Sequence, residues 1–594
     1  MTGVRISAAG AAAGWNPLAN LKEDKYSRTA DNVSGRSFVE IGGLKEGILQ
    51  GLKLSVNYGF DYIMSKRKTY YNPNFGNGKT TKGYLGIRDD RTFSYTFNQL
   101  LTWNRTFGLH NIDFLAGHEL YKYNKQRLSG AKTGFPFTGL YELDAATTLY
   151  DASSFTDNYV IESYLSRLNY NYNDKYYLSG SYRKDGTSRF NKNVRWGDFW
   201  SIGGSWRISQ ESFLKGQSWL NNLTLKASYG VQGNDNIGSF YAWQAFYSLA
   251  YPNGANAGAT VNSLENPDLK WEKNENLNIG LESRLFDRIS FSAEYYRRFT
   301  RDMLMNFPMA LSLGFRGFSK NIGNMQNSGI ETTISGDVIK GKKFNWNMTL
   351  MASTVKNKVI NLADKPEIIT GIFIIKEGEE VNSFYMAHSA GVDPATGDKL
   401  YWVWDEDENG VRGEKYISKD NAKAMQCRDI AGSRIPDIYG SISNEFRIGN
   451  FDIGFLATYS LGGKIYDGNY HDLLYNSYVG NAAHVDRLKS WRKPGDIVSI
   501  PRIDQNGIFK LTNTDDQLIS ASYLALKNIT LGYTFPSKLM RAMKLKDMKL
   551  TLTADNIYMF TSLKGLDPQY NFTGTTDNAY TPTRSVSLGL TINF

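Results

Sequence analysis

The chain alternates between apolar and polar residues over many short segments. The last ten residues make the pattern plainest, because small or polar residues separate Val586, Leu588, Leu590, Ile592 and Phe594. A period of two places these five side chains on one face of a β-strand. Ten residues is also about the length that a tilted strand needs to cross the hydrocarbon core of a bilayer. Taken alone, the segment fits an amphipathic strand of a soluble sandwich equally well.

The same alternation recurs along most of the sequence. It predicts about seventeen or eighteen strands, with the clearest apolar stripes in these ranges: 52–62, 91–105, 109–128, 164–172, 176–182, 200–208, 223–231, 277–281, 289–295, 328–338, 346–352, 439–448, 451–459, 529–535, 550–554 and 585–594. Residues 1–33 carry little pattern. We therefore predict a poorly patterned N-terminal segment over 1–33 and a barrel region over 34–594.

The predicted connections alternate in length. Tight turns are expected at 173–174, 287–288, 340–342 and 449–450, and long polar loops near 70–88, 129–158, 233–268, 300–320 and 463–515. Short turns at one rim and long loops at the other are typical of outer-membrane barrels. The apolar stripes also lack charged residues, and a Lys at the bilayer centre would cost about 2–4 kcal/mol. The sequence thus predicts an all-β fold, a transmembrane antiparallel β-barrel.

Composition agrees with this fold class and excludes others. No run of about 18 apolar residues occurs, which excludes transmembrane helices, and the 14% of aromatic residues suits interfacial girdles. Cys427 is the single cysteine, so an internal disulfide is excluded. The net charge of +10 comes from scattered Lys and Arg, which indicates a solvated surface or contact with anionic lipid headgroups and not nucleic acid. The N-terminus lacks the pattern of a signal peptide.

Motifs for catalysis are missing, so we do not expect an enzyme. The five histidines show neither a pairing at i,i+4 nor an H-E-x-x-H motif, which argues against a zinc hydrolase. The sequence also lacks the G-x-S-x-G pattern of a hydrolase nucleophile.

One acidic loop resembles the start of a calcium-binding loop. Asp405, Asp407 and Asn409 precede Gly410 with the D-x-D-x-N-G spacing that lets alternate oxygens converge on the ion. The twelfth position is Tyr416 in place of the bidentate Glu. The loop is therefore either a solvated acidic loop or a weak calcium or sugar-bridging site, and we expect no other cofactor.

Two aromatic clusters suggest ligand binding. Tyr241 and Trp243 lie in one predicted loop, and Trp402 and Trp404 precede the acidic loop. Aromatic faces beside carboxylates and amides suit sugar rings, which stack on them and hydrogen-bond at their edges. Residues of an interfacial girdle would explain the same clusters.

Several motifs resemble the SusC/RagA-like TonB-dependent outer-membrane transporters of Bacteroidetes-type bacteria. The motifs occur in family order, at 165–170, Asp-Gly-Thr-Ser-Arg-Phe at 185–190, 196–199, Asn-Pro-Asp-Leu-Lys-Trp-Glu at 266–272, 321–331, 491–496, 521–529 and 555–557. Each motif is weak alone, and the set is specific.

The resemblance implies a 22-stranded barrel plugged by an N-terminal domain and driven by the TonB complex. It also implies a SusD-like surface lipoprotein that helps to capture oligosaccharides or peptides. The plug, the TonB-contacting segment, the signal peptide and the first strands would precede residue 1. This chain is then expected to be a fragment or to have a misassigned start, and an open seam should separate its first and last strands.

This interpretation implies two further partners, and one alternative function remains open. We expect contact with outer-membrane lipids, and we expect the barrel-assembly machinery to read Phe594 as an assembly signal, as in related proteins. The rival is a structural or adhesive outer-membrane barrel without active transport. An outer-membrane hydrolase is a weaker alternative, because a Ser/His/Asp grouping is missing.

Overall fold

A large antiparallel sheet forms the body of the protein. The computed structural model describes residues 17–43, 46–47, 49–249, 251, 253–254, 256, 258–362, 366–475, 483–503, 513–563, 567–570, 573–576 and 581–594. Within these residues the sheet has 18 strands, in agreement with the predicted seventeen or eighteen. Their bounds are β1 (Lys25–Gly42), β2 (Leu52–Tyr71), β3 (Tyr84–Phe107), β4 (His110–Thr133), β5 (Thr148–Tyr172), β6 (Tyr176–Thr187), β7 (Trp196–Arg207), β8 (Leu220–Asn234), β11 (Glu272–Leu285), β12 (Ile289–Arg301), β15 (Asn324–Lys340), β16 (Phe344–Thr354), β17 (Lys356–Asn361), β25 (Ile438–Ile448), β26 (Phe451–Leu461), β29 (Tyr523–Thr534), β30 (Asp547–Thr561) and β31 (Ser585–Asn593).

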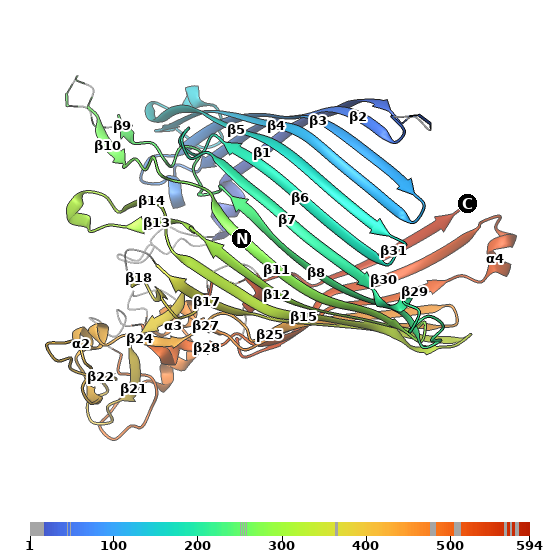
Figure 1. Cartoon of the computed structure of the whole chain (residues 1–594). Coiled ribbons are helices and arrows are strands. Elements are labelled where there is room, and N and C mark those ends of the chain that lie inside the picture. The colour runs from blue at the N-terminus through green and yellow to red at the C-terminus, as the bar shows by residue number, and fades with distance from the viewer. Residues whose placement is uncertain are drawn as a thin grey trace.

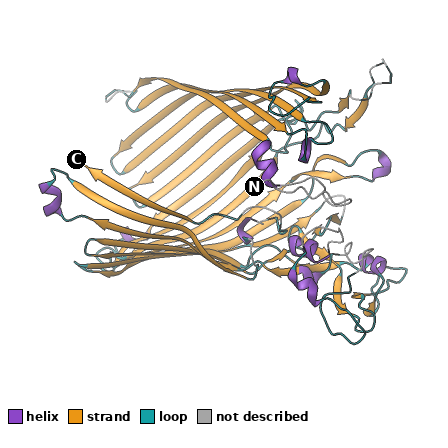
Figure 2. Ribbon diagram, turned by 180° about the vertical axis from the view of Figure 1, so that it is seen from behind, coloured by secondary structure: helices purple, strands orange, loops and turns teal. Residues whose placement is uncertain are grey.

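Each strand pairs with the strand that follows it in this series, with one exception. Strands β16 and β17 both pair with β15, one after the other along its length, and β25 pairs with β16. The sheet curls around a hollow, as Figures 1 and 2 show. In the described part of the chain, β1 pairs with β2 and β31 pairs with β30, and the two strands are not paired with each other. The sheet is therefore curved and open, with the seam expected between its first and last strands.

The convex face is apolar and the concave face is polar. On β7, the outward side chains of Trp200, Ile202 and Trp206 are 43%, 51% and 37% exposed. A hollow on the other face of the same region is lined by polar and small residues, among them Asn169, Asn171, Ser179, Ser205 and Ser228. A soluble sandwich buries its apolar face, so this inverted arrangement favours a sheet whose outer face meets lipid.

Tight turns occupy one rim, at the right of Figure 1, as predicted. Asn173 and Asp174 join β5 to β6 with φ of 50° and 52°, and Asp287 in the turn from β11 to β12 has φ of 54°. Left-handed residues of this kind match the twist of the two strands that they connect. Gly449 with φ of 59° makes the corresponding turn between β25 and β26.

Long connections occupy the opposite rim, at the left of Figure 1. They span 72–83, 134–147, 188–195, 235–271, 302–323, 362–437, 462–522 and 562–584. The segment 362–437 was not predicted as a long loop. The loop predicted over 129–158 is shorter, because β4 and β5 continue beyond the apolar belt, where the outer face no longer has to be apolar. Strand β1 also extends beyond the apolar belt and begins at Lys25. The boundary predicted at residue 34 therefore lies inside this strand. Residues 1–16 lie outside the described residues.

The long connections carry most of the smaller elements. The short strands are β9 (Phe246–Ser248), β10 (Thr260–Ser263), β13 (Leu304–Pro308), β14 (Gly317–Asn321), β18 (Glu367–Thr370), β19 (Phe373–Lys376), β20 (Ser383–Met386), β21 (His388–Val392), β22 (Lys399–Val403), β23 (Tyr416–Ser418), β24 (Asp429–Gly432), β27 (Lys464–Tyr466) and β28 (Leu518–Ser520). The α-helices are α1 (Pro17–Glu23), α2 (Asn421–Gln426), α3 (Gly468–Tyr475) and α4 (Ser537–Ala542). Single 3-10 turns are η1 (Gly76–Gly78), η2 (Leu143–Ala145), η3 (Ile208–Gln210), η4 (Leu311–Leu313), η5 (Val485–Lys489), η7 (Asp515–Gln517) and η8 (Pro568–Tyr570). Among the described residues, every helix is too short or too polar to cross a membrane.

Candidate ligand-binding site at the long-loop rim

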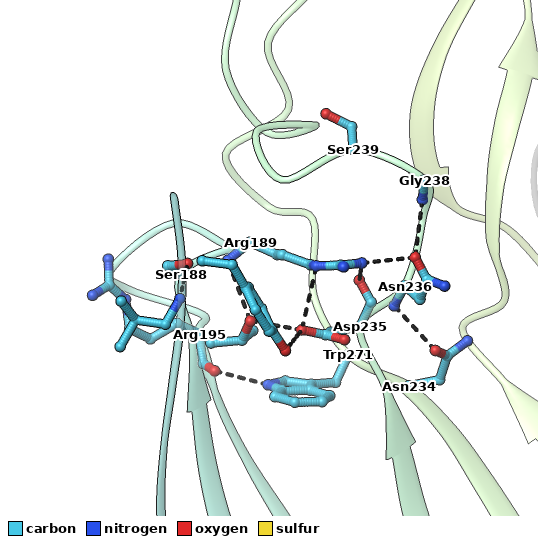
Figure 3. A network of polar contacts seen from close by, with 12 residues as sticks. Ser188, Arg189, Arg195, Asn234, Asp235, Asn236, Gly238, Ser239 and Trp271 are labelled. Carbon is cyan, nitrogen blue, oxygen red and sulfur yellow. Dashed lines mark hydrogen bonds and ion pairs between the residues drawn. The ribbon is translucent and has the colours of Figure 1, made fainter. Parts of the chain in front are cut away.

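Arg189 connects the loop between β8 and β11 to the inner face of the sheet through several contacts. Its guanidinium carbon lies 4.9 Å from the ring centroids of both Tyr159 on β5 and Phe240 in the long connection. The guanidinium also donates hydrogen bonds to Asn236 Oδ1 at 2.8 Å and to the backbone oxygen of Asp235 at 3.3 Å (Figure 3). A single cation thus binds two aromatic faces and the start of the loop.

The Asp235 carboxylate is the acceptor at the centre of this network. It accepts hydrogen bonds from Tyr159 Oη at 3.0 Å and Thr187 Oγ1 at 2.7 Å. Arg189 Nε lies 3.8 Å from the same carboxylate, and both side chains are largely buried, at 13% and 14% exposed. Because the donors come from β5, β6 and the connection after β6, the carboxylate holds three neighbouring elements at one point.

The two aromatic residues predicted in this loop serve its packing. Tyr241 Oη accepts a hydrogen bond from the backbone N–H of Asn158 at 2.7 Å. Trp243 packs against a buried cluster that contains Phe190 and Trp271. Trp271 in turn donates from Nε1 to the backbone oxygen of Arg195 at 2.7 Å (Figure 3). Tyr241 and Trp243 therefore hold the long connection against β5 and the buried cluster, and their contact with a ligand stays a prediction.

Trp402 lies in β22, and Trp404 follows the end of this strand. Trp404 is 2% exposed and packs in a cluster with Tyr401, Cys427 and neighbouring residues. Arg412 covers its ring, with the guanidinium carbon 4.5 Å from the centroid. This burial argues against the prediction that Trp404 stacks on a ligand, because the cluster and Arg412 cover its ring. Trp402 is 39% exposed and keeps a face open to solvent.

The acidic loop uses its carboxylates for contacts within the protein. Asp405 lies 2.5 Å from Lys423 Nζ, whose hydrogen bond lowers the pKa of this carboxyl. Asp407 Oδ1 accepts hydrogen bonds from the backbone N–H groups of Asn409 and Val411 at 2.9 and 2.8 Å. In the described part of the chain, no three His, Cys, Asp or Glu residues are grouped as a metal site. Calcium binding by Asp405, Asp407 and Asn409 stays a prediction, which this arrangement does not favour.

We expect at most weak calcium binding at this loop, with a Kd of about 10⁻⁴–10⁻³ M, as in extracellular modules. The physical reason is that a calcium ion would have to displace the Lys423 ammonium from Asp405. Calorimetry of the full-length protein against the Asp405→Ala/Asp407→Ala variant measures this directly. Micromolar affinity that the double variant loses would contradict the expectation.

A second charged cluster connects the 388–403 hairpin to the segment around η7, and no sequence motif pointed to it. His388 Nδ1 lies 2.8 Å from Asp515, which also accepts from the backbone N–H of Ser389 at 2.9 Å. Burial alone would raise the pKa of Asp515, but these hydrogen bonds lower it overall. Lys399 forms an ion pair with Asp516 beside it. The stabilisation from a lowered carboxyl pKa is fully present above the unfolded value of about 4, so this contact should persist at neutral pH. It should be lost as the pH falls from that value through the lower pKa of the folded state.

We predict that Asp235→Ala frees the start of the 235–271 connection. The change removes the carboxylate beside the Arg189 charge and leaves the hydroxyls of Tyr159 and Thr187 without their acceptor. Hydrogen bonds to charged groups contribute about 1.5–3 kcal/mol each. Amide exchange in the first turn of the connection should then become roughly 10–100-fold faster. Hydrogen exchange with mass spectrometry measures this, and Asp268→Ala in the same connection is the control. Unchanged exchange at 235–245 would contradict the anchoring role.

The fold and the polar hollow define an outer-membrane type of β-barrel sheet with elaborated loops on one rim. The sequence profile described as "TonB dependent receptor-like, beta-barrel" matches residues 9–557. The chain belongs to this family, which is a family of the outer membrane.

Individual relatives agree with this assignment. A TonB-dependent receptor of Formosa agariphila is 30% identical over 585 residues, covering 90% of this chain and 55% of the relative. The TonB-dependent receptor SusC of Bacteroides thetaiotaomicron is 26% identical, covering 98% of this chain and 57% of SusC. The structure of the RagAB peptide transporter superposes with a TM-score of 0.86 at 26% identity, covering 97% of this chain and 63% of that chain. The chain thus spans between a half and two thirds of the length of these relatives, and the resemblance to SusC and RagA is confirmed.

Proposed function

We propose that this chain is the barrel portion of an importer that takes up large nutrients, oligosaccharides or peptides, across the outer membrane with energy from the TonB complex. The observation that carries the proposal is the polar wall of the hollow, behind an apolar outer face, in a chain of the TonB-dependent receptor family. A wall of amide, hydroxyl and backbone groups offers hydrogen bonds to a hydrated oligomer without holding it tightly. The names of SusC and of the RagAB peptide transporter support the transport role.

We also infer a SusD-like surface lipoprotein as the partner at the long-loop rim. The loops on this rim are held in place by the Arg189–Asp235 network and by the contacts of His388 and Lys399 with the segment around η7. A partner that captures ligand needs a firm surface next to the mouth, and these contacts supply one. Trp402, with its exposed ring, is our candidate for ligand contact at this surface.

Gene deletion tests the proposal against its rival. A strain that lacks the complete gene should fail to grow on at least one oligosaccharide or peptide mixture that the parent uses, and should grow normally on the corresponding monomers. Deletion of the adjacent lipoprotein gene should give a similar defect. Equal growth of the deletion strain on every oligomer, together with weaker attachment of cells to surfaces, would favour the structural or adhesive barrel.

A further inference from the structure

The outward face of β12, β15 and β17 changes from apolar to basic at one height on the long-loop side. Tyr295 and Ile330 end the apolar stripe there, at 42% and 52% exposed. The next outward positions on these strands are Arg297, Ser328 and Lys356, because Ser328 pairs with Arg297 on one side and with Lys356 on the other. One step further, Gln326 pairs with Lys358. We call Arg297, Lys356 and Lys358 the basic rim patch.

The three cations of the basic rim patch are exposed, and among the described residues none of them forms an ion pair with a carboxylate. Their neighbours differ in this respect. Arg301 on the same face of β12 forms an ion pair with Glu275, and Arg298 on the opposite face donates to Asn274 Oδ1 at 3.0 Å. The acidic segment 377–379 joins the backbone of Val359 on β17, but its carboxylates form no ion pair with the patch. Glu275 also interacts electrostatically with Arg297. The positive charge of the patch is therefore only partly balanced, and its side chains stay free to bind an anion.

The spacing of the patch suits a phosphorylated group. Neighbouring strands lie about 4.8 Å apart, so the backbones of Arg297 and Lys356 are roughly 10 Å apart with Ser328 between them. Two long cationic side chains can converge from these positions on one anion, while the hydroxyl of Ser328 and the amide of Gln326 offer further hydrogen bonds. Arginine in particular binds phosphate through two parallel N–H groups.

We propose that the basic rim patch binds the phosphorylated headgroup of an outer-leaflet glycolipid of the lipid A type. A lipid is the source of the phosphate that fits this position, because the patch directly adjoins the apolar belt that would hold the acyl chains. Basic residues at a membrane surface attract anionic lipids by about 1 kcal/mol each. The proposal depends on the outer-membrane location of the barrel and is independent of what the protein imports.

Lipid binding to the full-length protein in detergent tests the proposal. The probe is diphosphorylated lipid A, and native mass spectrometry counts the bound lipid as its concentration is raised. The patch variant is Arg297→Gln/Lys356→Gln/Lys358→Gln. The matched control is Lys340→Gln/Lys342→Gln/Lys343→Gln, which removes the same charge from the turn at the opposite end of β15. Heat-modifiable migration on gels confirms that both variants are folded.

We expect the control to bind lipid A as the wild type does and the patch variant to bind roughly 10–100-fold more weakly. Lipid A without phosphates should bind the wild type as weakly as lipid A binds the patch variant, a comparison that needs no variant to fold. Equal loss in the patch variant and the control would overturn the proposal, because charge alone would then explain binding. Undiminished binding by the patch variant, or equal affinity for dephosphorylated lipid, would also overturn it.

Discussion

Deletion of Phe594 is expected to lower the amount of folded, heat-modifiable protein in outer membranes by about tenfold, the effect of roughly 1.4 kcal/mol of lost apolar contact. Phe594 follows the last strand and is 92% exposed. Its strand β31 has one paired edge, to β30. An aromatic anchor beside a free strand edge offers both an apolar contact and backbone groups to the assembly machinery. The measurement is the folded fraction by semi-native electrophoresis of membranes.

Two variants make this measurement specific. Phe594→Tyr keeps the ring and should assemble normally. Phe286→Ala removes another exposed aromatic side chain, 58% exposed, from a turn on the same rim, and should also assemble normally. Full assembly without Phe594, or an equal loss in Phe286→Ala, would refute its role as an assembly signal.

Residues 1–594 expressed alone are expected neither to form a closed barrel nor to transport. Strand β1 has 18 residues and β31 has nine, and the outer edge of each carries unpaired backbone groups in the described structure. Each unsatisfied N–H or C=O group in hydrocarbon costs several kcal/mol. Closing the two edges on each other would change strand tilt and stagger together, against side chains that already fit the present curvature.

The test compares two proteins expressed in the same strain. One is residues 1–594 with an added signal peptide, and the other is the protein encoded by the longest open reading frame at the same locus. The shorter protein should lack a heat-modifiable band, should be degraded by protease added to cells, and should not restore growth on the cognate oligomer. Growth supported by residues 1–594 alone would refute this prediction and would require that the two edges pair in the membrane.

Alternation predicted which side chains face outward, because a period of two is a local property of a strand. The stripes at 176–182 and 200–208 became the outer faces of β6 and β7, and the tight turns at 173–174 and 287–288 lie where the sequence placed them. The ends of the strands were harder to predict. Above the lipid belt both faces of a strand can be polar, as in the first half of β1, and the pattern that marks the strand disappears.

Contacts between loops could not be predicted, since they depend on which connections meet. Arg189 and Asp235 are 46 residues apart and belong to different connections. The motif around Arg189 supported the resemblance to the family, yet its spacing gave no sign of a partner. The burial of Trp404 could not be predicted for a similar reason, because exposure depends on the residues that cover a loop, such as Arg412.

Pairing between strands also creates polar clusters that the alternation of apolar and polar residues within one strand does not reveal. His118 on β4 lies 2.9 Å from Gln99 Oε1 on β3 and 3.1 Å from Glu162 Oε1 on β5. All three side chains are on the outward face, next to Tyr164, which is 50% exposed. Each strand taken alone shows one isolated polar residue in an apolar stripe. The register of three strands brings the three together, so that they satisfy one another.

Energy-dependent uptake tests whether the protein is a TonB-dependent importer. Cells with the complete gene, cells without it and cells without TonB would be incubated with fluorescent oligosaccharides and peptides chosen from the growth screen, and the label in the periplasm would be measured. We expect at least one oligomer to accumulate in cells with the complete gene. This accumulation should be lost in both deletion strains and restored when the gene is returned. Accumulation that is the same in all three strains, for every oligomer that supports growth of the parent, would contradict it.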